Sequence, residues 1–246
     1  MDKATFRIWR GDKSGGGYKD YQTEVTTGMV VLDAVHQVQA SEANDLAVRW
    51  NCKAGKCGSC SAEINGMPRL MCMTRLNTLD LSQPVTLQPM QTFPIVKDLV
   101  TDVSWNYRVK QGIKGLKTRP KDSPDGWRVA QRDVDRPQEF RKCIECFLCQ
   151  DVCHVLREHK MFDDFVGPRF LVYAAALEMN PIDAADRVAD LKDKHGIGLC
   201  NITKCCTNVC PEEIKITDNA IIPLKERVVD QFFDPVQKLF RMFAGK

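Results

Sequence analysis

The stretch Cys143-Ile-Glu-Cys146-Phe-Leu-Cys149-Gln-Asp-Val-Cys153 places four cysteines in the pattern C-x2-C-x2-C-x3-C. The chain of 246 residues contains 12 cysteines, far more than the packing of a core requires. Their grouping in short loops indicates that several thiols act together on a bound group. Any fold of this chain must therefore bring these thiols together.

Disulfide pairing is the first alternative for an even number of cysteines. Residues 1–5 lead directly into an alternating segment and show neither an apolar signal core nor twin arginines. The chain also exceeds the size, about 80 residues, below which disulfides commonly replace a core. We therefore favour a reducing compartment, with the thiols as metal ligands.

A separate set of cysteines lies nearer the N-terminus and comprises Cys52, Cys57, Cys60 and Cys72. Its spacing, C-x4-C-x2-C followed by a distant fourth cysteine, is that of plant-type [2Fe–2S] ferredoxins. Gly55 and Gly58 permit the positive φ angles and close backbone approach that such a loop needs. Zinc is the alternative, but a zinc ribbon pairs two C-x2-C knuckles and this set has only one.

The stretch at 143–153 has the spacing of bacterial two-cluster ferredoxins, in which the fourth cysteine ligates the other cluster. A second run follows as Cys200-Asn-Ile-Thr-Lys-Cys-Cys206-Thr-Asn-Val-Cys210-Pro211. If the fourth cysteine of each run ligates the cluster of the other run, one cluster has a complete [4Fe–4S] ligand set of Cys143, Cys146, Cys149 and Cys210. The other cluster receives Cys153, Cys200 and Cys206.

Thr203 stands where the middle cysteine of the second run is expected. A cluster held by three thiolates easily loses the iron at its fourth corner, which predicts [3Fe–4S]. This loss raises the reduction potential, as suits the last cluster before an electron acceptor. Cys205 is an alternative ligand, but only Cys206 keeps three residues before Cys210, so Cys205 is interpreted as a buried small hydrophobe.

We expect an α+β protein with two domains, residues 1–104 and residues 105–246. In the first domain, residues 5–9 and 21–27 are predicted strands, with a hairpin tip at Gly15-Gly16-Gly17 between them. Residues 61–66 are predicted to form a strand that enters a turn at Asn65-Gly66. The helix predicted over residues 30–40 has one apolar face, formed by Val31, Leu32, Val35 and Val38. These elements fit a small mixed sheet packed on one helix.

The second domain is expected to be helical. A surface connector is predicted over residues 110–136. Three helices are predicted after it. The first begins at Pro168 and ends before Asn180-Pro181, the second covers residues 183–194, and the third covers residues 217–230. Asp234-Pro235 should start a last amphipathic turn with an apolar stripe of Val236, Leu239, Phe240 and Phe243. Docking of this stripe on its own domain is favoured over contact with a membrane or partner.

Charge argues against a nucleic-acid partner, and hydropathy argues against a membrane-spanning segment in this chain. The net charge is only +3 and no basic tract occurs, so nucleic-acid binding is not expected. No apolar run approaches the roughly 18–20 residues that span a bilayer. If the protein works at a membrane, another chain must anchor it.

One plant-type set, one complete run and one run without its middle cysteine, in that order, resemble the iron–sulfur subunit of succinate dehydrogenases and fumarate reductases. Residues 52–66 resemble the [2Fe–2S] loop and next strand of this family, residues 93–102 its interdomain segment, and residues 165–176 its first long helix. The resemblance implies a plant-type ferredoxin domain of β-grasp fold, followed by an all-helical bacterial-type two-cluster ferredoxin domain.

The resemblance also implies a role as the electron-transfer subunit of a membrane-bound succinate:quinone oxidoreductase of the tricarboxylic acid cycle. A flavoprotein subunit with FAD would carry the substrate chemistry. Electrons would pass through [2Fe–2S], [4Fe–4S] and [3Fe–4S] clusters to a quinone at a membrane-anchor subunit, which would hold this chain peripherally at the cytoplasmic face of a bacterial cell membrane. A quinol:fumarate reductase, or another flavoprotein dehydrogenase, is the alternative setting.

The resemblance is weakest near the ligands of the third cluster, from which electrons would pass to the quinone. Many members have Pro after the fourth cysteine of the first run, where this chain has His154. Ubiquinone-type members have His after the first cysteine of the second run, where this chain has Asn201. The quinone-contact residues of the family therefore do not carry over. His154 is expected either to face the quinone as a hydrogen-bond donor or to be satisfied by a backbone carbonyl near the cluster.

Overall fold

A computed structural model describes residues 2–236, 239 and 243. The chain divides into two compact units. The first comprises the residues up to Trp105 together with Ile144–Val152 and Val209–Pro211, and the second comprises the remainder. Two short segments of the cysteine-rich half thus belong to the first unit. The division at residue 104 stays a prediction.

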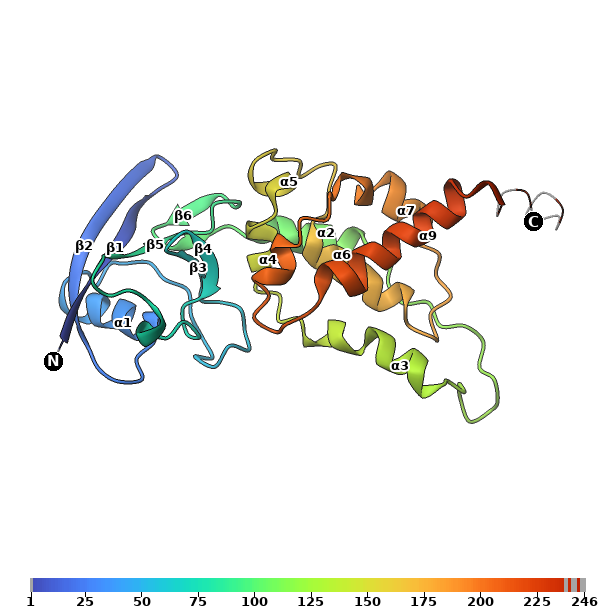
Figure 1. The fold of residues 1–246 in the computed structure, drawn as a ribbon, viewed down its shortest axis with the longest axis horizontal. Coiled ribbons are helices and arrows are strands. Elements are labelled where there is room, and N and C mark those ends of the chain that lie inside the picture. Colours follow the sequence, from blue (N-terminus) through green and yellow to red (C-terminus); the bar gives the residue numbers. More distant parts are fainter. Residues whose placement is uncertain (1, 237–238, 240–242, 244–246) are drawn as a thin grey trace. The chain divides into compact units, whose positions relative to one another are not determined.

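Within the described residues of the first unit, the strands form a seven-stranded mixed sheet (Figure 1). Its order is β4-β3-β5-β1-β6-β7, and β2 pairs with β1. The strands are β1 (Asp2–Asp12), β2 (Gly15–Val25), β3 (Ser61–Ile64), β4 (Met67–Leu70), β5 (Val85–Gln88), β6 (Ile95–Lys97) and β7 (Val100–Thr101). Because β1 runs parallel to β5 and antiparallel to β2, the expectation of a mixed sheet is confirmed.

The core of this unit lies between the sheet and helix α1 (Val31–Ser41). The four predicted apolar residues of α1 are all buried, which confirms the predicted helix. At its start the Asp33 carboxylate accepts a hydrogen bond from the amide of Val30 at 3.0 Å. Alternate residues of β1, Ala4, Phe6 and Ile8, are also buried. A short 3-10 turn, η1 (Leu76–Thr78), follows β4.

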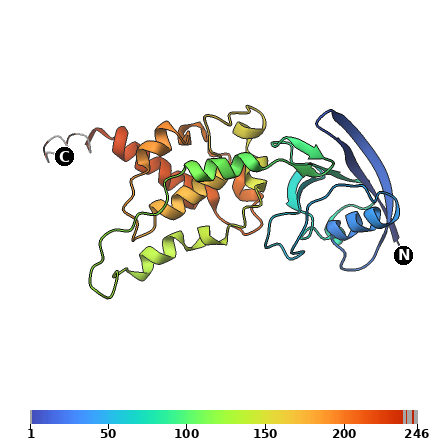
Figure 2. The same cartoon turned by 180° about the vertical axis from the view of Figure 1, so that it is seen from behind.

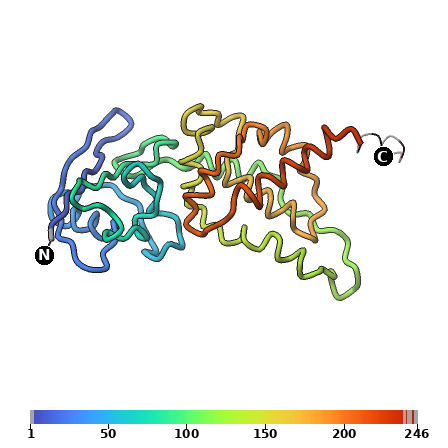
Figure 3. Tube along the Cα trace, viewed as in Figure 1, coloured from blue at the N-terminus to red at the C-terminus, as the bar shows by residue number. Residues whose placement is uncertain are grey.

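The β1–β2 hairpin turns two residues earlier than predicted (Figure 3, blue). The turn is formed by Lys13 and Ser14, because the Asp12 carboxylate accepts a hydrogen bond from the amide of Ser14 at 2.8 Å. The three glycines that were expected at the tip instead open β2. By contrast, the turn expected after β3 is confirmed: Asn65 and Gly66 have φ angles of 49° and 77° and join β3 to β4.

Helices predominate in the second unit, which Figure 2 shows from behind. The first unit contributes one further helix, α4 (Leu148–Asp151). The other helical elements are α2 (Ser104–Gly112), α3 (Gln131–Gln138), η2 (Glu139–Lys142), α5 (His154–Arg157), α6 (Pro168–Glu178), α7 (Val188–Asp193), η3 (Ile197–Leu199), α8 (Cys205–Asn208), η4 (Ile216–Ile221) and α9 (Ile222–Phe232). In the part of the chain with described coordinates, no helix combines the length and the hydropathy that crossing a bilayer requires.

Two of the predicted helices are confirmed, by α6 and by η4 continued in α9. The helix expected over residues 183–194 is wrong in its first half, since α7 begins only at Val188. The carboxylate of Asp183 accepts hydrogen bonds from the amides of Ala185 and Lys117, at 2.8 and 3.1 Å, and so holds a non-helical turn. The predicted connector over 110–136 is likewise helical at both ends, in α2 and α3.

The expected docking of the C-terminal stripe on its own domain is wrong for the residues that the structure describes. Val236, Leu239 and Phe243 are 58, 54 and 82% exposed. Phe240 lies outside the described residues. The expected cap is present, because Asp234 Oδ1 accepts a hydrogen bond from the amide of Val236 at 2.7 Å.

Candidate metal centres

The loop that carries Cys52 turns its backbone amides toward sulfur. Cys52 Sγ accepts hydrogen bonds from the amides of Ala54 and Lys56, at 3.4 and 3.3 Å. Gly55 and Gly58 have φ angles of 67° and 68°, as the sequence predicted. Amide donors stabilise sulfur that carries negative charge, so the loop suits thiolates bound to iron.

The thiols of this loop differ in pKa because they differ in burial and in hydrogen bonding. Although desolvation acts in the opposite direction, hydrogen bonds from Ser59 and with Cys52 lower the pKa of Cys57 to about 6. Burial raises the pKa of Cys60 to about 12. A metal ligand must be deprotonated. Cys57 meets this condition near neutral pH, whereas Cys60 needs a cationic metal to replace its proton.

Three of the cysteines assigned to the second set lie in the first unit: Cys146 and Cys149 are buried, and Cys210 is half-buried. Cys143 belongs to the second unit and directly precedes Ile144 in the chain. The run coils tightly around Cys146, because Glu145 and Phe147 both adopt left-handed backbone angles, with φ of 55° and 63°. Non-glycine residues rarely adopt such angles without a functional constraint.

The third set meets in one small cavity of the second unit. Cys153, Cys200 and Cys206 line it together with Thr203 and Cys205. Burial raises the pKa of Cys153 and of Cys206 to about 11 each, so these thiols also need a metal in place of the proton. The three thiols of the predicted set, with the hydroxyl residue Thr203 beside them, suit a cluster that has one corner without a thiolate. The thiol of Cys205 is a fourth in the same cavity.

Thr203 is held in this cavity by strained backbone on both sides. Ile202 and Lys204 have φ angles of 63° and 62°, although Ile202 is β-branched. Thr203 Oγ1 lies 3.3 Å from the sulfur of Cys205. The interpretation of Cys205 as a buried residue is wrong, because Cys205 is half-buried and lines the cavity.

His154 lines the same cavity and is the first residue of α5. Its ring meets the ring of His159 edge to face at 6.2 Å. The structure shows no hydrogen bond from the His154 ring to any described residue. A backbone carbonyl that satisfies this histidine, one of the two sequence-based alternatives, is therefore not found. Asn201 also lines the cavity.

Two residues that contact these sites were missed in the sequence. Thr217 is fully buried, and its hydroxyl lies 3.6 Å from Cys206 Sγ. Ser61 is buried, and its hydroxyl lies 2.9 Å from the carbonyl oxygen of Cys146. No local pattern marks either residue, because each contact joins segments that are distant in sequence.

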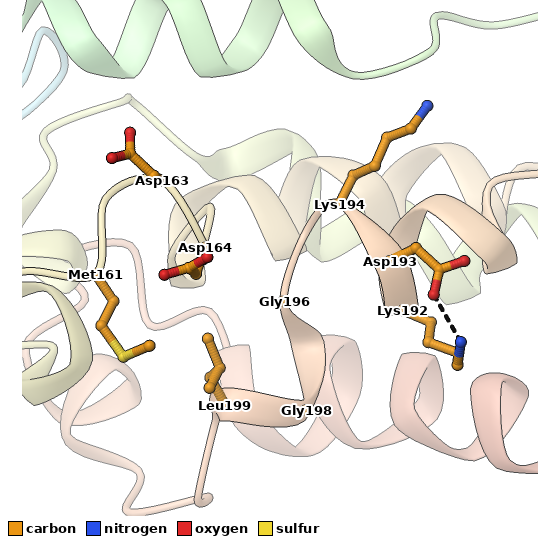
Figure 4. A pocket seen from close by; sticks show the side chains of 9 residues that line it. All are labelled: Met161, Asp163, Asp164, Lys192, Asp193, Lys194, Gly196, Gly198 and Leu199. Carbon is orange, nitrogen blue, oxygen red and sulfur yellow. Dashed lines mark hydrogen bonds and ion pairs between the residues drawn. The ribbon is translucent and has the colours of Figure 1, made fainter.

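Outside these sites, the second unit has an open hollow between the residues after α5 and the end of α7 (Figure 4). Carboxylate and ammonium groups line it, and Lys192 Nζ pairs with Asp193 Oδ1 at 2.6 Å. No cysteine lies among the described residues of its lining. Among the described residues of the whole chain, no three His, Cys, Asp or Glu side chains form a group that could hold a single metal ion.

Two family models match the chain. Residues 5–107 match a 2Fe-2S iron-sulfur cluster binding domain, and residues 139–214 match a 4Fe-4S dicluster domain. The first match includes the whole first cysteine set. The second includes all the remaining cysteines.

Individual relatives agree with these matches. A chain of the Mycobacterium smegmatis Sdh1 complex, solved in the apo form, is 57% identical and superposes with a TM-score of 0.92, over 95% of this chain and 98% of that chain. The fumarate reductase iron-sulfur subunit of Mycobacterium tuberculosis is 31% identical over 82% of each chain. The fumarate reductase iron-sulfur subunit of Haemophilus influenzae is 27% identical, over 79% of this chain and 80% of that protein.

The cysteine loops, the two domain matches and the full-length relatives lead to one assignment. The chain has a 2Fe-2S domain followed by a 4Fe-4S dicluster domain. It belongs to the family of iron–sulfur electron-transfer subunits of succinate dehydrogenases and fumarate reductases.

Proposed function

We propose that this chain is the electron-transfer subunit of a membrane-bound succinate:quinone oxidoreductase. The observation that carries the proposal is the cavity in which Cys153, Cys200 and Cys206 meet beside Thr203. A chain of this family that ends in a three-thiolate site has the high-potential terminus that a quinone acceptor requires. The N-terminal unit would then be a plant-type ferredoxin of β-grasp fold, and the helical part a bacterial-type two-cluster ferredoxin.

The proposed ligand sets follow the cysteine runs. Cys52, Cys57, Cys60 and Cys72 hold [2Fe–2S]; Cys143, Cys146, Cys149 and Cys210 hold [4Fe–4S]; Cys153, Cys200 and Cys206 hold [3Fe–4S]. When bound, these clusters supply one-electron redox chemistry. The residues of the chain supply thiolates, direct amides at sulfur, as at Cys52, and keep water from buried ligands such as Cys60 and Cys206.

The partners follow from the same role. A flavoprotein subunit with FAD would oxidise succinate as part of the tricarboxylic acid cycle, and a membrane-anchor subunit would hold the quinone. This chain would lie peripherally at the cytoplasmic face of a bacterial cell membrane. Succinate oxidation is favoured over fumarate reduction because the relative at 57% identity belongs to a complex named Sdh1, whereas the two relatives named fumarate reductase are 31% and 27% identical.

Fumarate reductase is the second candidate, because the curated relatives of matching length carry that name. The purified complex separates the two candidates by its rates in each direction. We expect faster quinone reduction with succinate than quinol oxidation with fumarate. A complex that works mainly in the second direction would reassign the chain to a quinol:fumarate reductase, or to another flavoprotein system where neither dicarboxylate reacts.

The three-thiolate site is tested by electron paramagnetic resonance of the oxidised complex. The wild-type protein should show a [3Fe–4S] signal. Thr203→Cys supplies the missing thiol, so this signal should disappear while the iron content rises by one per chain. Thr203→Ser, which keeps a hydroxyl, should retain the wild-type signal and serves as the matched control.

Two outcomes would contradict the proposed clusters. An oxidised wild-type sample that is silent at full iron content would show that a fourth ligand completes the third cluster. Colourless protein that contains zinc and does not bleach with dithionite would exclude an electron-transfer role altogether.

A further inference from the structure

We propose that Gly58 and Ser61 are positioning residues, which set the distance between the loop of the first cysteine set and the run around Cys146. The inference rests on the proposed function, since it assigns [2Fe–2S] to that loop and [4Fe–4S] to that run. Both segments lie in the first compact unit.

Gly58 brings the two backbones into direct contact. Its φ angle is +68°, and a Cβ atom built on it would lie 2.6 Å from Cys146 Cα and 2.9 Å from Cys146 N. Real Cβ atoms do not approach backbone this closely, so any side chain at this position would force the loop and the run apart. Gly58 stands between two proposed ligands of one cluster, and Cys146 is a proposed ligand of the next.

Ser61 ties the same two segments together by hydrogen bonding. Its hydroxyl lies 2.9 Å from the carbonyl oxygen of Gly58 and 2.9 Å from that of Cys146. The hydroxyl has one proton, which it donates to these two acceptors in turn or shares between them. Ser61 is buried and is the first residue of β3, where it pairs with Leu70 of β4. Because Ser61 is fixed in the sheet, its hydroxyl is held in place beside the two carbonyl oxygens.

The run is also held at its far end, independently of Gly58 and Ser61. The amide of Thr92 donates to Asp151 Oδ1 at 3.0 Å, and the Thr92 hydroxyl donates to the carbonyl oxygen of Asp151 at 2.8 Å. Nearer Cys146, the rings of Phe93 and Phe147 also meet edge to face, at 6.4 Å. The protein therefore fixes the run against the sheet domain at both ends, and the spacing does not depend on the bound group alone.

Such positioning has a functional consequence. Electron transfer between redox groups slows steeply with separation, and functional groups must be held to within about 0.5 Å of their working geometry. Two backbone segments approach each other most closely where one of them has glycine, because glycine has no Cβ atom. Gly58 and Ser61 touch no substrate, so their effect on electron transfer is exerted through the spacing of the two loops.

The test compares Gly58→Ala with Gly66→Ala in the intact complex. Both glycines have left-handed φ angles, +68° and +77°, but a Cβ on Gly66 would meet nothing within 4 Å. The control therefore carries the same backbone strain without the clash. The measurement is the microwave power saturation of the reduced [2Fe–2S] resonance while [4Fe–4S] is also reduced, because relaxation of one spin by the other weakens as they separate.

Gly58→Ala should keep both resonances at full intensity but saturate at lower power than the wild type, whereas Gly66→Ala should match the wild type. Ser61→Ala should shift saturation in the same direction, with exposed Ser82→Ala as its control. If the [2Fe–2S] resonance of both Gly58→Ala and Ser61→Ala saturates at the same microwave power as that of the wild type, the positioning role is overturned. If Gly58→Ala does not assemble, Ser61→Ala decides alone. Absence of either resonance from the wild-type protein would instead refute the proposed clusters.

Discussion

At the scale of single residues, His154 offers the sharpest test of the quinone end. Its ring lines the cavity of the third cysteine set and makes no hydrogen bond to the described residues, so its donor is available to a bound molecule. We expect His154→Leu to slow quinone reduction about 10-fold, the effect of losing roughly 1.4 kcal/mol of hydrogen bonding. The rate with succinate and a soluble dye that accepts electrons upstream of the quinone should stay unchanged.

His159→Leu is the matched control for this prediction. His159 is exposed and contacts the His154 ring, but it does not line the cavity. Its replacement should leave quinone turnover close to that of the wild type. Unchanged turnover in His154→Leu, with all clusters assembled, would show that the histidine has no part in the quinone reaction.

The same scale shows where sequence reasoning succeeds and where it stops. Cysteine spacing predicts that Cys153, Cys200 and Cys206 share one site, and these residues line one cavity together with Thr203. Spacing could not reveal Thr217 or Ser61, whose contacts with cysteine residues span 11 and 85 positions. It also misjudged Cys205, since the burial of a loop side chain depends on the elements packed around it.

At the scale of elements, Arg187 joins three segments of the second unit. Its side chain is fully buried and pairs with Glu178 of α6 at 3.2 Å and with Asp183 at 2.8 Å. It also donates to the carbonyl oxygens of Lys114 and Gly115, at 2.7 and 2.6 Å. Arg187→Met would leave the buried carboxylate of Asp183 without its cation and Glu178 with Arg227 as its remaining partner, so we expect the free energy of unfolding to fall by about 3–5 kcal/mol. Denaturant titration of the helical signal measures this loss.

An exposed ion pair of the first unit provides the comparison. Arg7 pairs with Asp20 across the β1–β2 hairpin at 2.8 Å, but both side chains are more than 40% exposed. Arg7→Met should therefore lower the free energy of unfolding much less than Arg187→Met does, because solvent screens an exposed pair. Equal losses in the two variants would mean that the buried group around Arg187 does not hold its segments together.

Element boundaries were predictable only where local chemistry decides them. Pro168 begins α6 and Asn65-Gly66 makes a hairpin turn, as the sequence indicates. The start of α7 was missed, because Asp183 bonds to Lys117, which lies 66 positions earlier in the chain. The tip of the first hairpin was misplaced because the Asp12 side chain, rather than the glycines, selects the turn.

At the scale of the whole molecule, the chain passes between its two compact units several times. The first unit takes Ile144–Val152 and Val209–Pro211 from the dicluster half, and with them Cys146, Cys149 and Cys210. A cut at residue 104 would leave the first cysteine set whole in one fragment. It would separate Cys146 from Ser61 and Asp151 from Thr92, which are contacts inside the first unit.

This arrangement predicts unequal behaviour of the two fragments. Residues 1–104, expressed alone, should bind [2Fe–2S], because all four thiols and the amides around Cys52 are present. Residues 105–246 contain every other proposed ligand but should take up less iron than they do in the intact chain, since their first run has lost the bonds that hold it. Co-expression of both fragments should restore the missing iron, as measured by iron and sulfide analysis. Full loading of residues 105–246 alone would show that the bound clusters, rather than the sheet domain, organise the run.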